Sequence, residues 1–296
     1  MSGFDVCLIR PHSVCRLALL FLALSVTLNP RANADDQPTE STESRDFTVE
    51  RPSEKLSVRV VSPKPDKLAK SSLLLLNFST DRTTSLTAEI YAQPAKAFLA
   101  NGHRVASFDL PAHGERVDVR GSGIDGMCAQ FIAGDDPFAR FAADGSAVID
   151  ALIQSGDAVA DRIVVCGVSR AGYCGLRLAA ADKRVCGVAA LAPVTDWRQL
   201  REFAAVKERD DVAKLALDHF ADALAGRPVY MAIGNRDERV GTDCCTRFAL
   251  KLFESEERMK QPESKIRFLV VDDSKGHALD LKWRDVGSEF LLKLAK

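Results

Sequence analysis

Short apolar runs alternate with segments of helical periodicity along most of the chain. The runs are rich in Val, Ile and Leu without polar alternation, which is typical of strands buried on both faces of a parallel sheet. They lie at residues 72–78, 104–109, 163–168, 185–191, 229–233 and 266–271. Helical spacing is found at residues 85–101, 137–155, 170–181, 243–255 and 279–294. This alternation predicts an α/β fold with a doubly wound, mainly parallel sheet and helices on both faces, in a single domain over residues 56–296.

Four stretches depart from this pattern. Residues 35–55 are polar and rich in Pro, Ser, Thr and Glu, which predicts a flexible leader. Residues 56–61 alternate between apolar and polar and predict an antiparallel edge strand. The glycine-rich residues 117–136 predict a long loop, and loops of that length in compact domains are often functional. Residues 196–225 predict two helices broken near Arg209.

The first 34 residues have the pattern of a secretory signal peptide. Arg10 and Arg16 supply positive charge, residues 17–28 are apolar, and Ala32-Asn33-Ala34 is an Ala-x-Ala cleavage pattern. We therefore expect an exported protein, periplasmic or secreted, with no stable membrane insertion after cleavage. The alternative is an uncleaved membrane anchor, although the apolar run is shorter than a membrane span requires.

Removal of residues 1–34 leaves a nearly neutral chain. It takes away Arg10, Arg16 and Arg31 together with Asp5, so 37 basic and 40 acidic residues remain and the formal charge is −3. This balance gives no electrostatic reason to expect nucleic acid or an anionic membrane as a partner. The sequence does not predict the oligomeric state.

Six cysteines remain after cleavage, at positions 128, 166, 174, 186, 244 and 245. An even number in an exported protein permits disulfides. The adjacent Cys244 and Cys245 allow two interpretations: one of them forms a disulfide with Cys128 or Cys174, or both are free thiols on a helix. There is no Cys-x-x-Cys and no histidine cluster, so we expect no metal and no cofactor.

The clearest candidate for chemistry is Ser169, between a buried strand and a helix. Gly167, Ala171 and Gly172 surround it with small residues, as a strand that turns at once into a helix requires. The pattern resembles the nucleophile elbow of the α/β-hydrolase family. Such a turn would expose Ser169 Oγ and place the N–H of Arg170, at the positive end of the helix, where an oxyanion develops. The Arg170 side chain has two open interpretations, a substrate carboxylate site or a salt bridge on the helix surface.

An acid and a histidine follow in the order that this family uses. Residues 234–240 resemble the Gly-x-x-Asp-x-x-Val stretch of dienelactone-hydrolase-like and prolyl-oligopeptidase-like members, which makes Asp237 the candidate acid. Asp243 and Asp196 are rival candidates. His277 follows a glycine after the last expected strand, where the family carries its base.

The turn at 109–116 also resembles the Asp-x-Pro-x-His-Gly turn that follows the fourth strand in many relatives.

The second oxyanion donor of the family comes from the loop after the strand at residues 72–78. Most relatives have a His-Gly turn in the donor loop, whereas this chain has Asn77-Phe78-Ser79-Thr80. Aligning Asn77 with the histidine makes the N–H of Ser79 the first candidate and that of Phe78 the second. The departure also leaves open a hole that is weak or forms only with substrate.

The resemblance implies two-step acyl transfer by Ser169, with His277 as base and Asp237 orienting it. We expect a serine hydrolase that cleaves a small-molecule or polymer-borne carboxylic ester, with residues 196–225 as a candidate cap, since family members often carry a cap at that point. A peptidase or acyl-peptide hydrolase of prolyl-oligopeptidase type is an alternative, although such relatives carry a large N-terminal propeller. A dienelactone hydrolase proper would use cysteine as nucleophile. The other alternative is a non-catalytic binding protein on a hydrolase scaffold.

Overall fold

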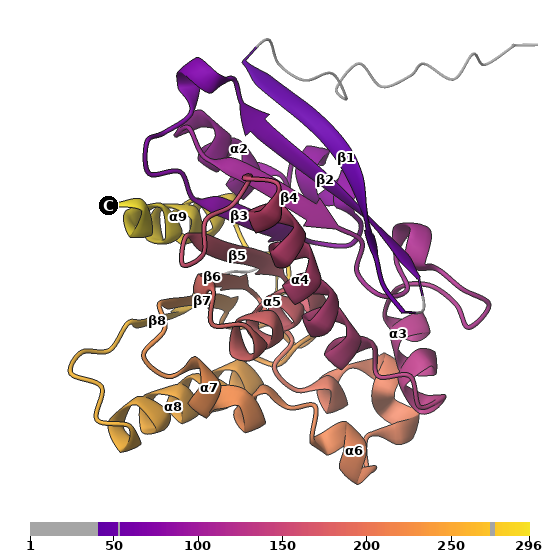
Figure 1. The fold of residues 1–296 in the computed structure, drawn as a ribbon. Coiled ribbons are helices and arrows are strands. Elements are labelled where there is room, and N and C mark those ends of the chain that lie inside the picture. Colours follow the sequence, from indigo (N-terminus) through magenta and orange to yellow (C-terminus); the bar gives the residue numbers. More distant parts are fainter. Residues whose placement is uncertain (1–40, 53, 273–275) are drawn as a thin grey trace, which may run out of the picture. The chain divides into compact units, whose positions relative to one another are not determined.

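The computed structural model describes residues 41–52, 54–272 and 276–296, and these residues build an eight-stranded sheet (Figure 1). The predicted signal peptide lies outside the described residues. The strands are β1 (Thr42–Glu50), β2 (Lys55–Pro63), β3 (Leu74–Phe78), β4 (Arg104–Phe108), β5 (Ile163–Val168), β6 (Val185–Leu191), β7 (Val229–Gly234) and β8 (Ile266–Val271). Their order is β1-β2-β4-β3-β5-β6-β7-β8. Pairing is antiparallel at β1–β2 and β2–β4 and parallel from β4 to β8. The predicted mainly parallel sheet is therefore confirmed.

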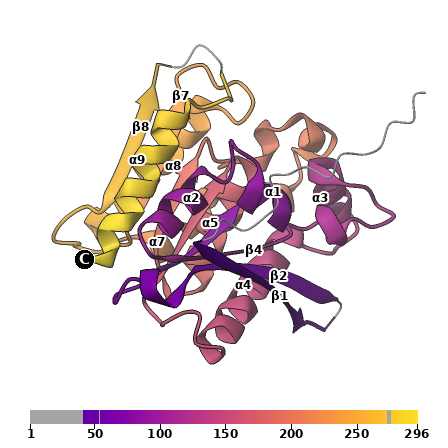
Figure 2. The same ribbon diagram turned by 90° about the horizontal axis from the view of Figure 1, so that it is seen from above.

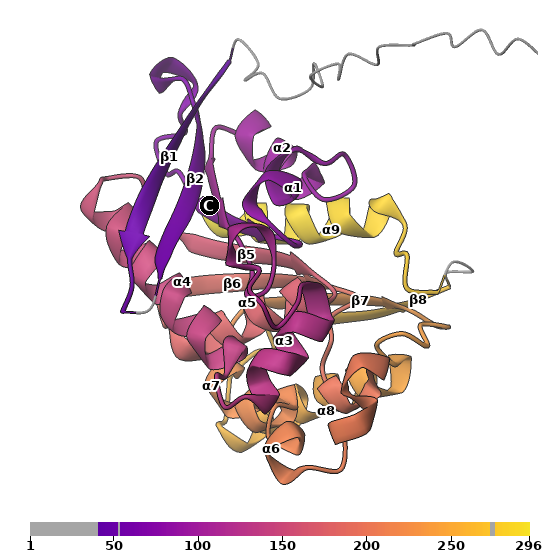
Figure 3. The same cartoon turned by 90° about the vertical axis from the view of Figure 1, so that its right-hand side faces the viewer.

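Helices cover both faces of the sheet, as Figures 2 and 3 show. The helices are α1 (Arg82–Thr87), α2 (Gln93–Ala100), α3 (Gly123–Ile132), α4 (Pro137–Gln154), α5 (Arg170–Ala181), α6 (Asp210–Ala213), α7 (Ala221–Leu224), α8 (Thr242–Arg258) and α9 (Leu281–Leu292). Helices α2 and α9 pack together on one face, and α4, α5 and α8 lie on the other. Strand β4 lies on one side of β3 and strands β5 to β8 on the other, and right-handed crossovers in the two directions place helices on opposite faces. The doubly wound fold is therefore confirmed.

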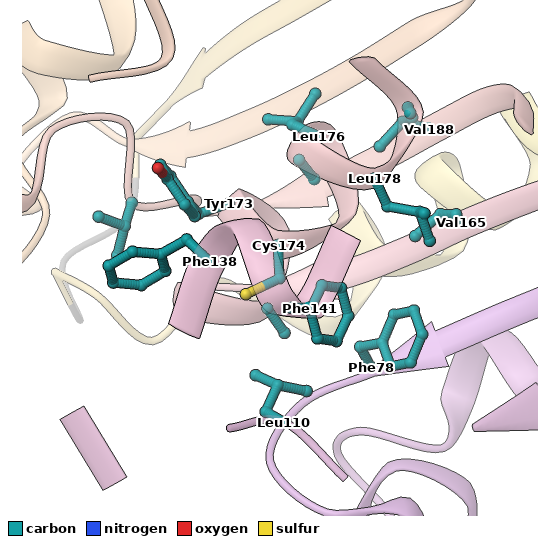
Figure 4. Close-up of a cluster of buried hydrophobic side chains, with 14 of the residues drawn as sticks. Phe78, Leu110, Phe138, Phe141, Val165, Tyr173, Cys174, Leu176, Leu178 and Val188 are labelled. Atoms are coloured by element: carbon teal, nitrogen blue, oxygen red, sulfur yellow. The ribbon is translucent and has the colours of Figure 1, made fainter. Parts of the chain in front are cut away.

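Each face of the sheet has its own hydrophobic core, and this explains the unbroken apolar runs. In β3, Leu76 and Phe78 belong to the core under α4 and α5, whereas Leu75 belongs to the core under α2 and α9. Figure 4 shows part of the first core, where the rings of Phe78 and Phe141 meet edge to face with centroids 5.2 Å apart. Burial of each large apolar side chain contributes about 1.5–3 kcal/mol. Strands buried on both faces therefore tolerate no polar alternation.

The prediction of a flexible leader is wrong for the described part of residues 35–55. Residues 42–50 form β1, which pairs with β2 over its whole length. The reason is an alternation that composition hides, because Phe47 and Val49 pack against the core while charged neighbours face solvent. Asp46 also receives two hydrogen bonds from Arg59 of β2, at 2.8 and 3.0 Å. As a result, β2 is an interior strand and β1 is the edge.

Two further segments differ from prediction, and in the first of them local capping and a proline explain the difference. The expected helix 85–101 is two helices, since Pro94 has no N–H to continue a helix but fits the first turn of α2. Asp81 caps α1 by accepting a hydrogen bond from the Thr84 N–H at 2.9 Å. The expected loop 117–136 contains α3, which buries Met127.

Residues 196–225 form short helical pieces instead of the two predicted helices. Besides α6 and α7 there are 3₁₀ turns at Trp197–Gln199, Arg201–Val206 and Leu217–Phe220. Trp197 is fully buried, with its ring centroid 4.4 Å from that of Phe138 at the start of α4. The Tyr173 hydroxyl of α5 donates to the Leu215 carbonyl at 2.7 Å. The segment is thus anchored in the core, and its action as a cap stays a prediction.

None of the helices in the described residues combines the length and apolar character needed to cross a bilayer.

Candidate active site

Ser169 is the single residue between β5 and α5, and its backbone is strained. Its φ is 57° and its ψ −121°, a region that a residue with a side chain adopts at a cost of about 1–3 kcal/mol. Neighbouring backbone fixes this conformation. The Ser169 N–H donates to the Leu191 carbonyl at 2.8 Å, and its carbonyl accepts from the Val194 N–H at 3.1 Å. The exit of β6 therefore holds the turn in place.

The small residues around Ser169 have a steric reason. A Cβ at Gly167 would overlap the carbonyl oxygen of Ala171, and one at Gly172 would lie 3.0 Å from Cβ of Pro193. Ala171 is itself completely buried. The first turn of α5 consequently packs against β5 more closely than larger residues would allow.

The structure brings together the three residues proposed from sequence as nucleophile, base and acid. Nε2 of His277 lies 3.0 Å from Ser169 Oγ, and Nδ1 of His277 lies 2.8 Å from Asp237 Oδ2. The other carboxylate oxygen of Asp237 accepts from the N–H groups of Arg239 and Val240 at 3.0 and 3.1 Å. An ionised carboxylate only accepts, so Nδ1 carries the proton and Nε2 is the acceptor that faces the serine hydroxyl. This arrangement is that of a base held in one tautomer.

A tight turn after β7 presents Asp237. The hydroxyl of Thr242 donates to the Gly234 carbonyl at 2.6 Å and accepts from the Asp237 N–H at 3.2 Å. Gly241, with φ of 80°, immediately precedes α8. The Asp237 side chain has no solvent exposure, whereas that of His277 is 32% exposed. The carboxylate is thus fixed and buried, and the imidazole can meet a ligand.

The two rival acids bond to other groups. Asp196 caps a 3₁₀ turn and forms an ion pair with Arg198 at 2.6 Å. Asp243 pairs with Arg247 at 2.7 Å, and its side chain is 70% exposed. The carboxylate that contacts His277 is therefore neither of these.

The Ser79 amide, the first sequence candidate for the second oxyanion donor, is already engaged within the protein. Its N–H donates to the hydroxyl oxygen of Ser85 at 2.9 Å, and that hydroxyl donates to the Asp81 carbonyl at 2.7 Å. Ser85 is completely buried. The N–H that an oxyanion would need therefore has a buried internal acceptor in this structure, and the role expected for Ser79 stays a prediction.

Other amides at this edge of the sheet are differently placed. Phe78 ends β3 opposite Gly167 of β5 and remains a candidate. The next turn residue, Thr80, has its carbonyl fixed by the Leu110 N–H at 3.0 Å, and its own N–H has no acceptor among the described residues. The N–H of Arg170 opens α5, where no intrahelical acceptor exists. The sequence points to Ser79 and not to Thr80, because nothing in it shows that the Ser85 hydroxyl accepts from the Ser79 amide.

His113, in the turn after β4, is buried and neutral. Its Nδ1 donates to the Pro111 carbonyl at 2.8 Å, and its Nε2 has no partner among the described residues. Burial lowers the pKa of His113 to about 4, and the nearby positive charge of Arg170 also disfavours its protonation. At neutral pH this side chain therefore adds no charge to the site.

All six cysteines of the described residues are free thiols, so the disulfide hypothesis for Cys244 and Cys245 is wrong. Burial raises the pKa of Cys245, which lies close enough to Asp237 for that carboxylate to raise it further. The Cys245 side chain packs as an apolar group in the core, close to the turn that carries Asp237. Within the part of the chain that the structure describes, no group of three or more His, Cys, Asp or Glu side chains could hold a metal ion.

Comparison with known proteins adds a family and a set of similar folds. The sequence model described as "Alpha/beta hydrolase family" matches residues 81–285, which is more than half of the chain and includes Ser169, Asp237 and His277. A search of curated protein sequences finds no match.

Several solved structures have a similar fold. A cold-adapted esterase from an Arctic intertidal metagenomic library is 20% identical with a TM-score of 0.65, over 89% of this chain and 99% of that one. Acetyl xylan esterase 1 from Thermoanaerobacterium sp. is 17% identical with a TM-score of 0.64, over 88% and 86%. Dipeptidyl peptidase 4 from Porphyromonas gingivalis is 18% identical with a TM-score of 0.62, over 86% of this chain but 36% of the peptidase. At these identities the likeness concerns the fold.

Proposed function

Because the chain belongs to the alpha/beta hydrolase family, we propose that it is an exported serine hydrolase that cleaves carboxylic esters through an acyl-enzyme. The observation that carries the proposal is the continuous hydrogen-bonded series from Ser169 through His277 to Asp237. A serine hydroxyl is a weak nucleophile at neutral pH and needs a base within hydrogen-bond reach that a third group orients. These three side chains meet both requirements.

In the first half of the reaction, Ser169 Oγ attacks the ester carbonyl carbon while its proton passes to Nε2 of His277. The imidazolium that forms is stabilised by the buried Asp237 carboxylate at its Nδ1–H. The tetrahedral intermediate then collapses, the bond to the alkoxy oxygen breaks, and Nε2–H protonates the departing alcohol. The acyl group stays on Ser169.

In the second half, water replaces the alcohol. Nε2 of His277 takes a proton from the water as its oxygen attacks the acyl carbon, and collapse of the second intermediate returns the proton to Ser169 Oγ. The half-exposed position of His277 supports this step, since its ring is accessible to solvent while its partner carboxylate is not.

For the oxyanion we propose the N–H of Arg170 and that of Thr80. Both amides lack an acceptor among the described residues, and both lie at the carboxyl edge of neighbouring strands β5 and β3. The Leu110 N–H donates to the Thr80 carbonyl at 3.0 Å, which ties this turn to the segment after β4 before substrate binds. One such donor typically contributes about 10²–10³ in rate.

Ester substrates, small or polymer-borne, are favoured over peptides by the neighbouring structures. Two of the proteins with a similar fold are described as an esterase and an acetyl xylan esterase, and the chain matches each over most of both lengths. The peptidase alternative is supported by the dipeptidyl peptidase, of which the chain spans only about a third. Export is supported by the signal-peptide pattern of residues 1–34.

The test is hydrolysis of p-nitrophenyl esters, from acetate to long acyl chains, by the wild type and by Ser169→Ala. Turnover by the wild type alone supports the proposal. If the wild type cleaves peptide p-nitroanilides and not the esters, the peptidase alternative replaces it. If neither substrate reacts and a fluorophosphonate probe does not label Ser169, the protein is a binding protein on a hydrolase scaffold.

A further inference from the structure

The residue that follows the nucleophile carries a charge with no partner. Among the described residues, the Arg170 side chain forms no hydrogen bond and no ion pair, and its Nε is buried. Two other partly buried arginines have carboxylate partners. Arg82 bonds to Asp109, and Arg239 forms two hydrogen bonds with Glu202. The salt bridge on the helix surface, one of the two interpretations from sequence, is therefore not formed with any residue that the structure describes.

An unpaired guanidinium in this position is unfavourable in the free protein. Burial lowers the pKa of Arg170, which means that its surroundings disfavour the charged form. Even so, a guanidinium stays protonated at neutral pH. A partly desolvated charge without a counter-ion costs free energy that an opposite charge would recover.

The groups that act electrostatically on Arg170 do not neutralise it. Glu202 is the carboxylate among them, but its two oxygens accept hydrogen bonds from Arg239 at 2.8 and 2.7 Å. Arg239 is itself a second positive charge near Arg170. Burial raises the pKa of the neighbouring Cys174 thiol to about 12, so this thiol carries no charge at neutral pH. Among the described residues, these groups therefore leave the positive charge of Arg170 uncompensated.

We propose that the Arg170 guanidinium binds a carboxylate on the substrate, so that the enzyme prefers esters that carry a negative charge near the scissile bond. This inference rests on the proposed ester hydrolysis at Ser169. The planar guanidinium suits bidentate binding of a carboxylate. Its position at the first residue of α5, directly after Ser169, links recognition of the charge to the reacting carbonyl. The carboxylate can belong to the alcohol part or to the acyl part.

Two pairs of esters distinguish these sources. The alcohol-side pair is 4-acetoxybenzoate and its neutral counterpart 4-acetoxybenzamide. The acyl-side pair is monoethyl adipate and the neutral ethyl adipamate. The measured quantity is the ratio of kcat/KM for the charged ester to that for the neutral ester. In the wild type we expect this ratio to be about tenfold to a hundredfold in one pair, as for a charge-assisted hydrogen bond in a partly buried site.

The variants are Arg170→Met, Arg170→Lys and the matched control Arg104→Met. All three variants keep the backbone amides. Arg104 is another arginine whose buried Nε has no partner among the described residues. It is the first residue of β4 and therefore lies at the amino-terminal ends of the parallel strands, opposite to the end that carries Ser169. We expect the ratio to fall close to one in Arg170→Met, to an intermediate value in Arg170→Lys, and to keep the wild-type value in Arg104→Met. Circular dichroism of each variant verifies folding, and if Arg170→Met does not fold, Arg170→Lys carries the test.

A wild-type ratio near one in both pairs overturns the inference while ester hydrolysis stands. So does a high ratio that Arg170→Met retains. If the wild type hydrolyses neither these esters nor the p-nitrophenyl esters, the proposed function fails, and the binding of adipate and 4-hydroxybenzoate is then measured by calorimetry. If the wild type binds these carboxylates and Arg170→Met does not, the carboxylate site stands. If both proteins bind them equally, or neither binds them, the carboxylate site is ruled out.

Discussion

Oδ2 of Asp237 lies 2.8 Å from Nδ1 of His277, and Oδ1 of the same carboxylate accepts two backbone N–H groups. The carboxylate is therefore oriented on both sides. Oδ1 accepts hydrogen bonds within the turn after β7, so only Oδ2 can face the imidazole. Because the two oxygens have different partners, an amide at position 237 can adopt only one orientation.

In Asp237→Asn, the amide oxygen must face the N–H groups of Arg239 and Val240, which leaves the NH₂ group facing His277. The imidazole then keeps its proton on Nε2, where it cannot accept the proton of Ser169. We expect kcat for p-nitrophenyl acetate to fall by about 10³–10⁴ with the fold intact. Asp243→Asn is the control and should change kcat less than twofold, and a loss below tenfold in Asp237→Asn would point to another acid.

Ser169→Gly should be more stable than Ser169→Ala, although we expect both variants to be inactive. Both remove the hydroxyl, but only glycine adopts φ 57° and ψ −121° without strain. After the greater flexibility of glycine in the unfolded chain is subtracted, we expect a net gain of about 1 kcal/mol. Thermal melts of the two variants should differ by about 2–4 °C. Equal melting temperatures would mean that the turn stores no strain.

Gly167→Ala should disrupt the elbow, because its Cβ would overlap the carbonyl oxygen of Ala171. Neither backbone can move away, since β5 is an interior strand and α5 packs on it. We expect a loss of about 2–4 kcal/mol in urea unfolding together with loss of activity. Gly134→Ala is the control. Its Cβ meets no atom within 4 Å, and its cost is the positive φ alone, about 1–2 kcal/mol.

The positions of Ser169, Asp237 and His277 after successive strands could be predicted because each follows an apolar run that the sequence makes plain. The Thr80 amide that we propose as second oxyanion donor could not be predicted, because the hydroxyl that accepts from the Ser79 N–H belongs to Ser85, and a contact across a turn leaves no periodic signal. Strand β1 was missed for a related reason. Its few apolar positions are diluted by charged residues, and its stability depends on pairing with β2, which composition does not show.

Ser85→Ala distinguishes Ser79 from Thr80 as the second oxyanion donor. The variant removes the acceptor of the buried Ser79 N–H and should destabilise the fold by about 1–3 kcal/mol. If Thr80 supplies the donor, loosening of this turn should lower kcat with little change in KM. If the Ser79 amide is the donor, its release should raise kcat or leave it unchanged. Steady-state kinetics with p-nitrophenyl acetate separates the two, and urea unfolding confirms the first effect.

The stability of the protein should fall between pH 6.5 and 4 because of His113. Burial lowers its pKa to about 4, below the value near 6.5 of an unfolded chain, so the unfolded state binds the proton first as pH falls. Above pH 6.5, neutral His113 makes its full contribution to the free energy of unfolding. This contribution is lost as the pH falls towards 4, and the loss is at most about 3 kcal/mol. His113→Gln cannot titrate, and its free energy of unfolding in urea should decline less over this range than that of the wild type. Parallel pH profiles for the two proteins would show that another group is responsible, with His103, whose pKa burial also lowers, the next to substitute.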